Sequence, residues 1–200
     1  MKLYLNKTSP YARLVLATAH EAGVASRVET IWLEPWDDNP QLLAVNPLSK
    51  VPALITDNGT TLIESALICD HLVTLSGSDH LLPPQGVRRE SVLERLGIGR
   101  AVIDCAFGSV IQRRFNDGAD TGLSQRWLKA LPRAVAVLEN IAAKRALPTE
   151  PDLGDVAVTV ALDYVDFRLP EISWRKDAPA LVRAVDAVLA RSSMTATDPR

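Results

Sequence analysis

The chain has 200 residues, of which 47% are hydrophobic and 23% are charged, and its formal net charge at pH 7 is −2. This length suits one large domain or two small ones, with enough apolar residues to form a core. The scattered lysines and arginines argue against a nucleic-acid partner. No apolar run approaches the ~20 residues of a membrane-spanning helix, and charged or polar residues interrupt any signal-peptide core near the start.

The cysteines and histidines argue against metal binding and structural disulfides. Cys69 and Cys105 form no CxxC motif, and His20, His71 and His80 have no ligand spacing. Both cysteines lie in apolar helical stretches, which favours buried, inert thiols. Such cysteine usage is typical of a reducing compartment, so we expect a cytoplasmic protein without a metal ion.

The first third of the chain predicts a βαβ unit. Residues 3–5 form a short buried strand, and a helix over 11–22 begins with Ser9 as N-cap and Pro10 in its first turn. Residues 27–33 alternate and contain β-branched side chains, as expected of a second strand. Because a helix connects the two strands, they should pair in parallel.

A hairpin and a helix follow this unit. Residues 34–40 form a polar loop bounded by prolines, with a helical turn after it. Strands are expected at 51–56 and 60–63, because the sequence between them contains the hairpin signal Asn58-Gly59. A helix with one apolar face then covers 65–75.

The remainder of the chain predicts helices only. Residues 77–86 look like a linker between a first domain at 1–76 and an all-helical domain at 87–200. Helical patterns run over 87–116, 124–143, 155–168 and 178–191. The third is apolar nearly all round, which indicates a helix buried on all sides, and Asp152 and Asp155 form a capping-box pattern at its start.

The stretch from Asn46 to Leu54 carries the main functional signal. Pro52 opens an apolar run, and proline cannot donate to a sheet ladder, so it belongs at a strand's first residue or at a bend. Glu64-Ser65 follows the next short run and opens a helical pattern. Together these motifs place an extended backbone edge beside a helix N-terminus, which can hold a small peptide carrying a carboxylate.

A βαβ-ββα domain followed by helices, with Ser9-Pro10-Tyr11, Val51-Pro52 and Glu64-Ser65 in register, resembles the cytosolic glutathione transferases. The resemblance covers nearly the whole chain, and the set Asn-Pro-x-x-Lys-Val-Pro-x-Leu plus Glu-Ser is specific. The Ser-Pro-Tyr-Ala-Arg order is similar to a bacterial subgroup of glutathione-transferase-like proteins, whose physiological substrates are mostly undefined. The resemblance implies a thioredoxin-like first domain and a homodimer.

The family resemblance also implies a glutathione site and a role for each residue in it. Pro52 would be cis, which turns the backbone of Val51 outward to pair with the cysteinyl part of glutathione. Ser65 would cap its helix and face the γ-glutamyl carboxylate, and Glu64 would pair with the ammonium. Lys50 would neutralise the glycine carboxylate, unless it is simply a solvated lysine.

The implied chemistry is ionisation of the glutathione thiol, because a model thiol titrates near 8.5. Ser9 lies at a helix N-terminus and is the expected catalytic hydroxyl, unless it only caps the helix. Thr8 is the alternative donor, and Asn6 and Tyr11 are also within reach. Tyr4 is expected to be buried on the first strand. A serine here argues against cysteine-dependent thiol–disulfide exchange.

The second substrate would be a small hydrophobic electrophile held against an apolar wall. The candidate wall residues are Tyr11, Trp36, Phe107, Ile111 and Phe115, although an aromatic residue on a helix is more often part of the core. Two other functions remain open: a non-catalytic glutathione-binding or interaction module of the same fold, and a glutathione-dependent reductase or isomerase.

Overall fold

The computed structural model describes residues 1–200. Its contacts divide the chain into two compact units, one of Met1–Pro84 with Ser192–Arg200 and the other of Gln85–Arg191. The predicted class, an α/β domain plus an all-helical domain, is confirmed. The structure differs from the predicted division at the C-terminus, because residues 192–200 leave the helical unit and pack with the first unit.

The first unit contains a four-stranded sheet in the order β2-β1-β3-β4. The strands are β1 (Lys2–Leu5), β2 (Glu29–Trp32), β3 (Ala53–Ile55) and β4 (Thr61–Ile63). Strands β1 and β2 are parallel, and β3 runs antiparallel to β1 and β4, as the predicted βαβ unit and hairpin require. Strand β2 is shorter than predicted because Ala25–Arg27 forms a 3₁₀ turn.

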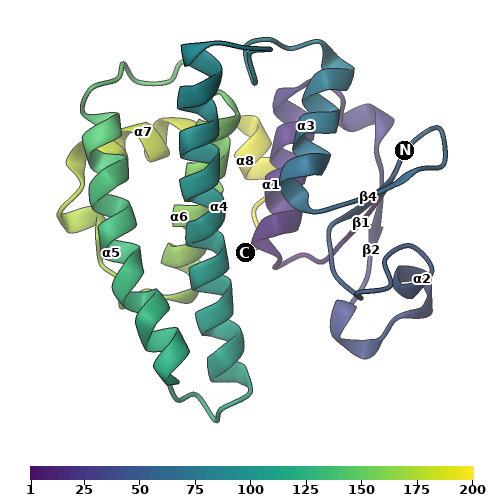
Figure 1. Ribbon diagram of the computed structural model, residues 1–200, viewed down its shortest axis with the longest axis horizontal. Helices are drawn as coiled ribbons and strands as arrows, with labels where there is room; N and C mark the ends of the chain where they lie inside the picture. The colour runs from purple at the N-terminus through teal and green to yellow at the C-terminus, as the bar shows by residue number, and fades with distance from the viewer. The chain divides into compact units, whose positions relative to one another are not determined.

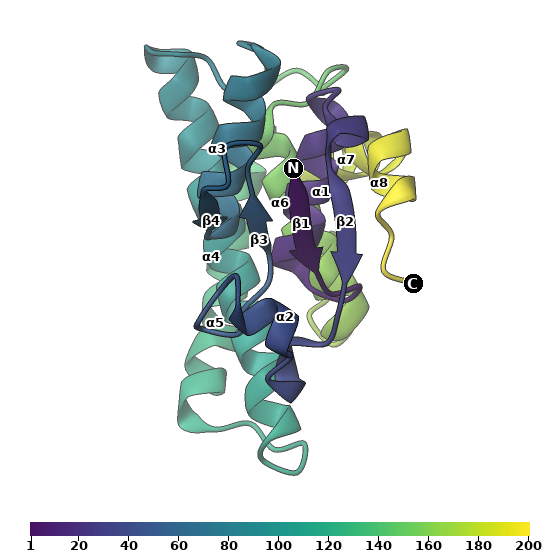
Figure 2. The ribbon, with the colours of Figure 1, turned by 90° about the vertical axis from the view of Figure 1, so that its right-hand side faces the viewer.

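Helices cover both faces of this sheet (Figure 2). The helices of the first unit are α1 (Pro10–Glu21), α2 (Pro40–Leu43), α3 (Ser65–Ser76) and α8 (Ser192–Ala196). Helices α1 and α3 pack against each other on one face, and the short α2 lies on the other. There Leu42 forms a buried cluster with Tyr4 and Ala53, so Tyr4 is buried on β1 as predicted.

The second unit consists of helices, among which α4 and α5 form a long pair (Figure 1). Its helices are α4 (Val87–Arg114), α5 (Gly122–Ala142), α6 (Leu153–Arg168) and α7 (Pro179–Leu189). Residues 153–165 of α6 are all buried, as predicted for this apolar helix. Helix α4 approaches α6 closely at Gly99, where an added Cβ would lie 2.8 Å from the Ala157 carbonyl carbon.

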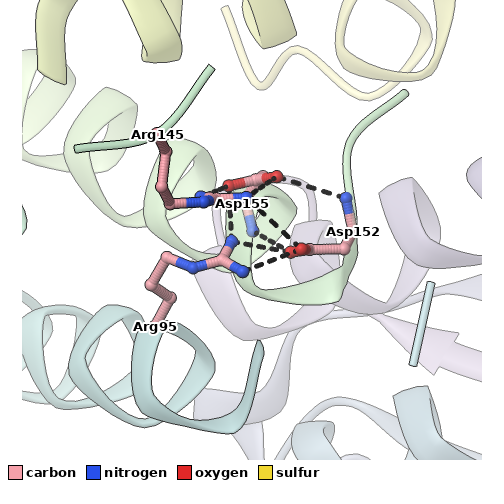
Figure 3. Close-up of polar contacts among 4 residues, drawn as sticks. All are labelled: Arg95, Arg145, Asp152 and Asp155. Carbon is pink, nitrogen blue, oxygen red and sulfur yellow. Dashed lines mark hydrogen bonds and ion pairs between the residues drawn. The ribbon is translucent and has the colours of Figure 1, made fainter. Parts of the chain in front are cut away.

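The predicted capping box of α6 is present and belongs to a buried ion-pair network (Figure 3). The Arg95 guanidinium donates to both oxygens of Asp152 at 2.7 Å and to Oδ1 of Asp155 at 2.5 Å. Arg145 donates to Asp155 at 2.7 Å from the other side. The neighbouring cavity between α5, α6 and α7 encloses about 30 Å³, enough for one or two waters rather than a substrate.

Candidate functional site

The sheet register brings the predicted binding motifs to one edge of the first unit. Ala53 of β3 lies opposite Tyr4 of β1 and opposite Ile63 of β4. Val51-Pro52 leads directly into β3 and Glu64-Ser65 directly follows β4, so both motifs lie at this end of the hairpin. The loops that follow β1 and β2 leave the sheet at this same edge, because β1 and β2 are parallel to each other and β1 is antiparallel to β3.

Ser9 caps helix α1 at this edge, as predicted. Its Oγ accepts a hydrogen bond from the Ala12 N–H at 3.2 Å, and the residue is 9% exposed. A hydroxyl has one donor proton and two acceptor lone pairs. No group of the chain accepts the Ser9 hydroxyl proton, so the hydroxyl can cap the helix and still donate to a ligand.

The alternative donor, Thr8, is engaged differently. Its backbone N–H and its hydroxyl both donate to Oδ1 of Asn6, each at 3.1 Å. The Asn6 amide then donates to the Leu33 carbonyl at 3.3 Å and to Glu34 at 3.2 Å. Asn6 therefore joins the loop after β1 to the loop after β2, a role that the local sequence pattern did not indicate.

The Val51-Pro52 peptide bond is cis, as the resemblance implies. Sheet pairing of β3 begins at Ala53, so the Val51 backbone lies outside the ladder. Asn46 shapes the preceding loop, because its buried amide donates to the Lys50 carbonyl at 2.8 Å and its Oδ1 accepts from Leu48. The Lys50 side chain is exposed beside this segment.

The expectation that Ser65 caps α3 is wrong. Glu64 is the N-cap, since its carboxylate reaches the Ala66 N–H at 3.0 Å, and Ser65 is the first residue of the helix. Ser65 is buried, and its hydroxyl donates to Glu64 at 3.4 Å. Glu64 has a φ of 77°, a conformation that costs a non-glycine residue ~1–3 kcal/mol.

The five candidate wall residues belong to both units. Tyr11 and Trp36 lie in the first unit, and the other three lie in the second, with Phe107 and Ile111 on α4 and Phe115 at its end. None is fully buried, and Trp36 and Phe115 are 44% and 65% exposed. Only these two are exposed, the other three are half-buried, and the assembly of all five into one wall remains a prediction.

The two cysteines lie on helices of different units. Cys69 is buried on α3, with the Thr18 hydroxyl 3.3 Å from its sulfur. Cys105 lies on α4, where burial, followed by the charge of Asp104, raises the pKa of its thiol. No group of three or more His, Cys, Asp or Glu side chains is placed to hold a metal ion. None of the helices is long and apolar enough to cross a membrane.

Comparison with known proteins identifies the family. Residues 8–75 match the model of the glutathione S-transferase N-terminal domain, and residues 121–187 match that of the C-terminal domain. A glutathione transferase family member from Pseudomonas fluorescens Pf-5, crystallised with bound glutathione, is 32% identical with a TM-score of 0.84. The alignment covers 100% of this chain and 98% of that chain. The chain belongs to the glutathione S-transferase family.

Two further comparisons support membership in the glutathione S-transferase family. A crystal structure of a Pseudomonas fluorescens Pf-5 family member with bound S-(propanoic acid)-glutathione is 30% identical, covers 100% of both chains and has a TM-score of 0.82. The uncharacterized GST-like protein YibF of Escherichia coli (strain K12) is 27% identical over 203 residues, covering 100% of this chain and 98% of YibF. The resemblance predicted from the sequence, including its thioredoxin-like first domain, is thus confirmed.

Proposed function

We propose that this glutathione S-transferase family member binds glutathione at the sheet edge and activates its thiol for attack on a small hydrophobic electrophile. The observation that carries the proposal is the β3–β4 hairpin, which pairs Ala53 with Ile63, so that the backbone of Val51 and the start of α3 both lie just beyond this end of the hairpin. An extended peptide with a terminal carboxylate suits such an edge, and the Pseudomonas fluorescens relative was crystallised with glutathione bound.

Each part of glutathione has a complementary group at this edge. The cysteinyl backbone pairs with the N–H and C=O of Val51 as an added strand. The γ-glutamyl carboxylate accepts from the N–H of Ser65, and also from the Ser65 hydroxyl once that proton turns from Glu64 to the ligand. The dipole of α3 favours an anion there by ~0.3–1 kcal/mol. The carboxylate of Glu64 receives the ammonium, and the exposed Lys50 neutralises the glycine carboxylate.

Ser9 then stabilises the thiolate as the thiol proton leaves for water. The thiolate attacks the electrophilic carbon, a carbon–sulfur bond forms, and the leaving group departs with its electron pair. We favour Ser9 over Thr8 because the Thr8 hydroxyl proton is given to Asn6, whereas the Ser9 proton is uncommitted. Each unit by which the thiol pKa falls corresponds to ~1.36 kcal/mol of preference for the anion.

The second substrate, the cellular compartment and the oligomeric state are inferred from the same thiol chemistry and family resemblance. The second substrate is a small apolar electrophile, and the S-substituted glutathione bound in a relative is the kind of conjugate that such a transfer yields. We place the protein in the cytoplasm, where thiols stay reduced, and expect a homodimer. A binding-only module and a reductase or isomerase share the same edge and differ from a transferase in turnover.

Isothermal titration calorimetry with glutathione tests the binding site. Glu64→Gln keeps an oxygen for the Ala66 N–H but loses the charge, so we expect affinity to fall by about 10- to 100-fold, the worth of a hydrogen bond to a charged group. Glu29→Gln, on the exposed β2 strand, is the matched control and should bind as wild type does. A wild-type protein that shows no heat of binding at millimolar glutathione contradicts the proposal.

A further inference from the structure

The C-terminal segment 192–200, which follows the whole helical unit, returns to the first unit and packs on α1. Both views show α8 beside α1 (Figures 1 and 2). Ser193 and Met194 of this segment are buried. The Ser193 hydroxyl donates to the carboxylate of Glu21, the last residue of α1. We call residues 192–200 the C-terminal clamp.

The clamp also reaches the first turn of α1 through Arg13. The Arg13 guanidinium donates to the Met194 carbonyl at 3.4 Å, and Arg13 is only 5% exposed. Its backbone N–H donates to the Ser9 carbonyl at 3.0 Å, so the same residue contacts both the clamp and the helix cap. The hydrogen bond from Arg200 holds the pKa of Asp198 below its usual range, and the charge of Arg13 contributes as well.

A buried guanidinium is stable only while acceptors and counter-charges surround it. The clamp supplies the Met194 carbonyl and the Asp198 charge to Arg13. Weakening these contacts should draw the guanidinium toward water and displace the first turn of α1. Because the Ser9 carbonyl is hydrogen-bonded to Arg13, the Ser9 hydroxyl would shift with that turn.

We infer that the C-terminal clamp holds the first turn of α1 in place for thiol activation, with Arg13 as the positioning residue. The inference rests on the proposed role of Ser9 in stabilising the glutathione thiolate. In the proposed function, glutathione is anchored by Val51 and α3, and neither of these is part of the clamp contacts. The clamp should therefore affect ionisation of the bound thiol while leaving affinity for glutathione nearly unchanged.

The test uses full-length Arg13→Met and Ser193→Ala variants, which remove the two clamp contacts at opposite ends of α1, one with the Met194 carbonyl and one with Glu21. Thiolate absorbance at saturating glutathione is titrated against pH, and kcat and KM are measured with an aryl halide. We expect the bound thiol pKa to rise by about half a unit, close to a helix-terminus contribution, and kcat to fall about threefold at pH values below that pKa. KM for glutathione should stay within about twofold, and Arg13→Lys should restore part of the loss.

Arg191→Met is the matched control, because Arg191 precedes the clamp and donates to the Thr149 carbonyl within the second unit. It should leave the thiol titration unchanged. Folded Arg13→Met and Ser193→Ala variants with wild-type thiol pKa and kcat would overturn the inference. If Arg13→Met does not fold, Ser193→Ala decides alone. A wild-type protein that binds no glutathione refutes the proposed function itself, whereas wild-type ionisation in both variants refutes only the clamp.

Discussion

Replacing Arg95 with methionine should strongly destabilise the second unit. Arg95 is 4% exposed and makes three hydrogen bonds to carboxylates, two with Asp152 at 2.7 Å and one with Asp155 at 2.5 Å. Methionine fills much of the same space but carries no charge. The substitution therefore leaves two carboxylates at the start of the buried helix α6 without their principal cation.

The expected cost follows from this geometry. Removing one partner of a buried ion pair costs ~3–5 kcal/mol, because the remaining charge stays buried. Arg145 still reaches Asp155 at 2.7 Å and Asp152 at 3.5 Å, which should place the loss toward the lower end of that range. Even ~3 kcal/mol is a large part of the ~5–15 kcal/mol that stabilises a typical domain.

The loss should depend on pH. Burial alone would raise the pKa of Asp152, but hydrogen bonding and charge from Arg95, with a smaller contribution from Arg145, hold it below its usual range. A carboxyl whose folded-state pKa is lowered stabilises the fold above its unfolded pKa of ~3.9, and this stability disappears as pH falls through the folded value. The difference between Arg95→Met and wild type should therefore be largest near pH 7 and shrink below about pH 4.

Urea denaturation at a series of pH values measures this difference. Arg100→Met on the same helix is the matched control, because its partner Asp104 is 58% exposed and the pair should contribute no more than ~1 kcal/mol. An Arg95→Met variant whose free energy of unfolding at pH 7 is within ~1 kcal/mol of the wild-type value would show that the network does not support α6 through its charges. A loss of stability that does not change with pH would show the same.

Two further predictions concern helix packing and capping. Gly99→Ala should lower the free energy of unfolding by ~1–3 kcal/mol, because the added Cβ would lie 2.8 Å from the α6 backbone. Gly97 has open space around it, so Gly97→Ala should raise the free energy of unfolding by up to ~1 kcal/mol. Equal effects in thermal unfolding would contradict the close helix approach. Glu139→Ala should lower the free energy of unfolding by ~1–2 kcal/mol, because the Glu139 carboxylate accepts hydrogen bonds from the N–H groups of Ala180 and Leu181 at 3.1 and 2.7 Å. Asn140 is exposed, so Asn140→Ala should leave the free energy of unfolding nearly unchanged.

Features specified by neighbouring residues could be predicted from the sequence. Ser9 and Pro10 fix the start of α1, and Asp152 and Asp155 cap α6, because each interaction lies within a few residues. The parallel β1–β2 pair follows from the βαβ connection and the β3–β4 hairpin from the signal Asn58-Gly59. The β1–β3 pairing that joins them is not specified by either signal. The family resemblance added the cis bond before Pro52, which local pattern alone leaves undecided.

Features that depend on distant residues or on unusual backbone could not be predicted in this way. Glu64 caps α3 in place of the predicted Ser65, because Glu64 adopts a positive φ that few non-glycine residues adopt. Helix α7 has no capping side chain of its own at its start and uses Glu139 from α5. Segment 192–200 is predicted to belong to the helical domain at 87–200, and only its long-range contacts with Arg13 and Glu21 place it in the first unit.

The most direct test of the central claim is the pKa of the glutathione thiol on the protein, measured by thiolate absorbance in wild type, Ser9→Ala and Thr8→Val. We predict a wild-type pKa clearly below the ~8.5 of a model thiol, raised by about one unit in Ser9→Ala and unchanged in Thr8→Val, with similar glutathione affinity in all three proteins. A bound thiol whose pKa is near its value in solution, or whose pKa does not change when the Ser9 hydroxyl is removed, would contradict thiol activation at the start of α1.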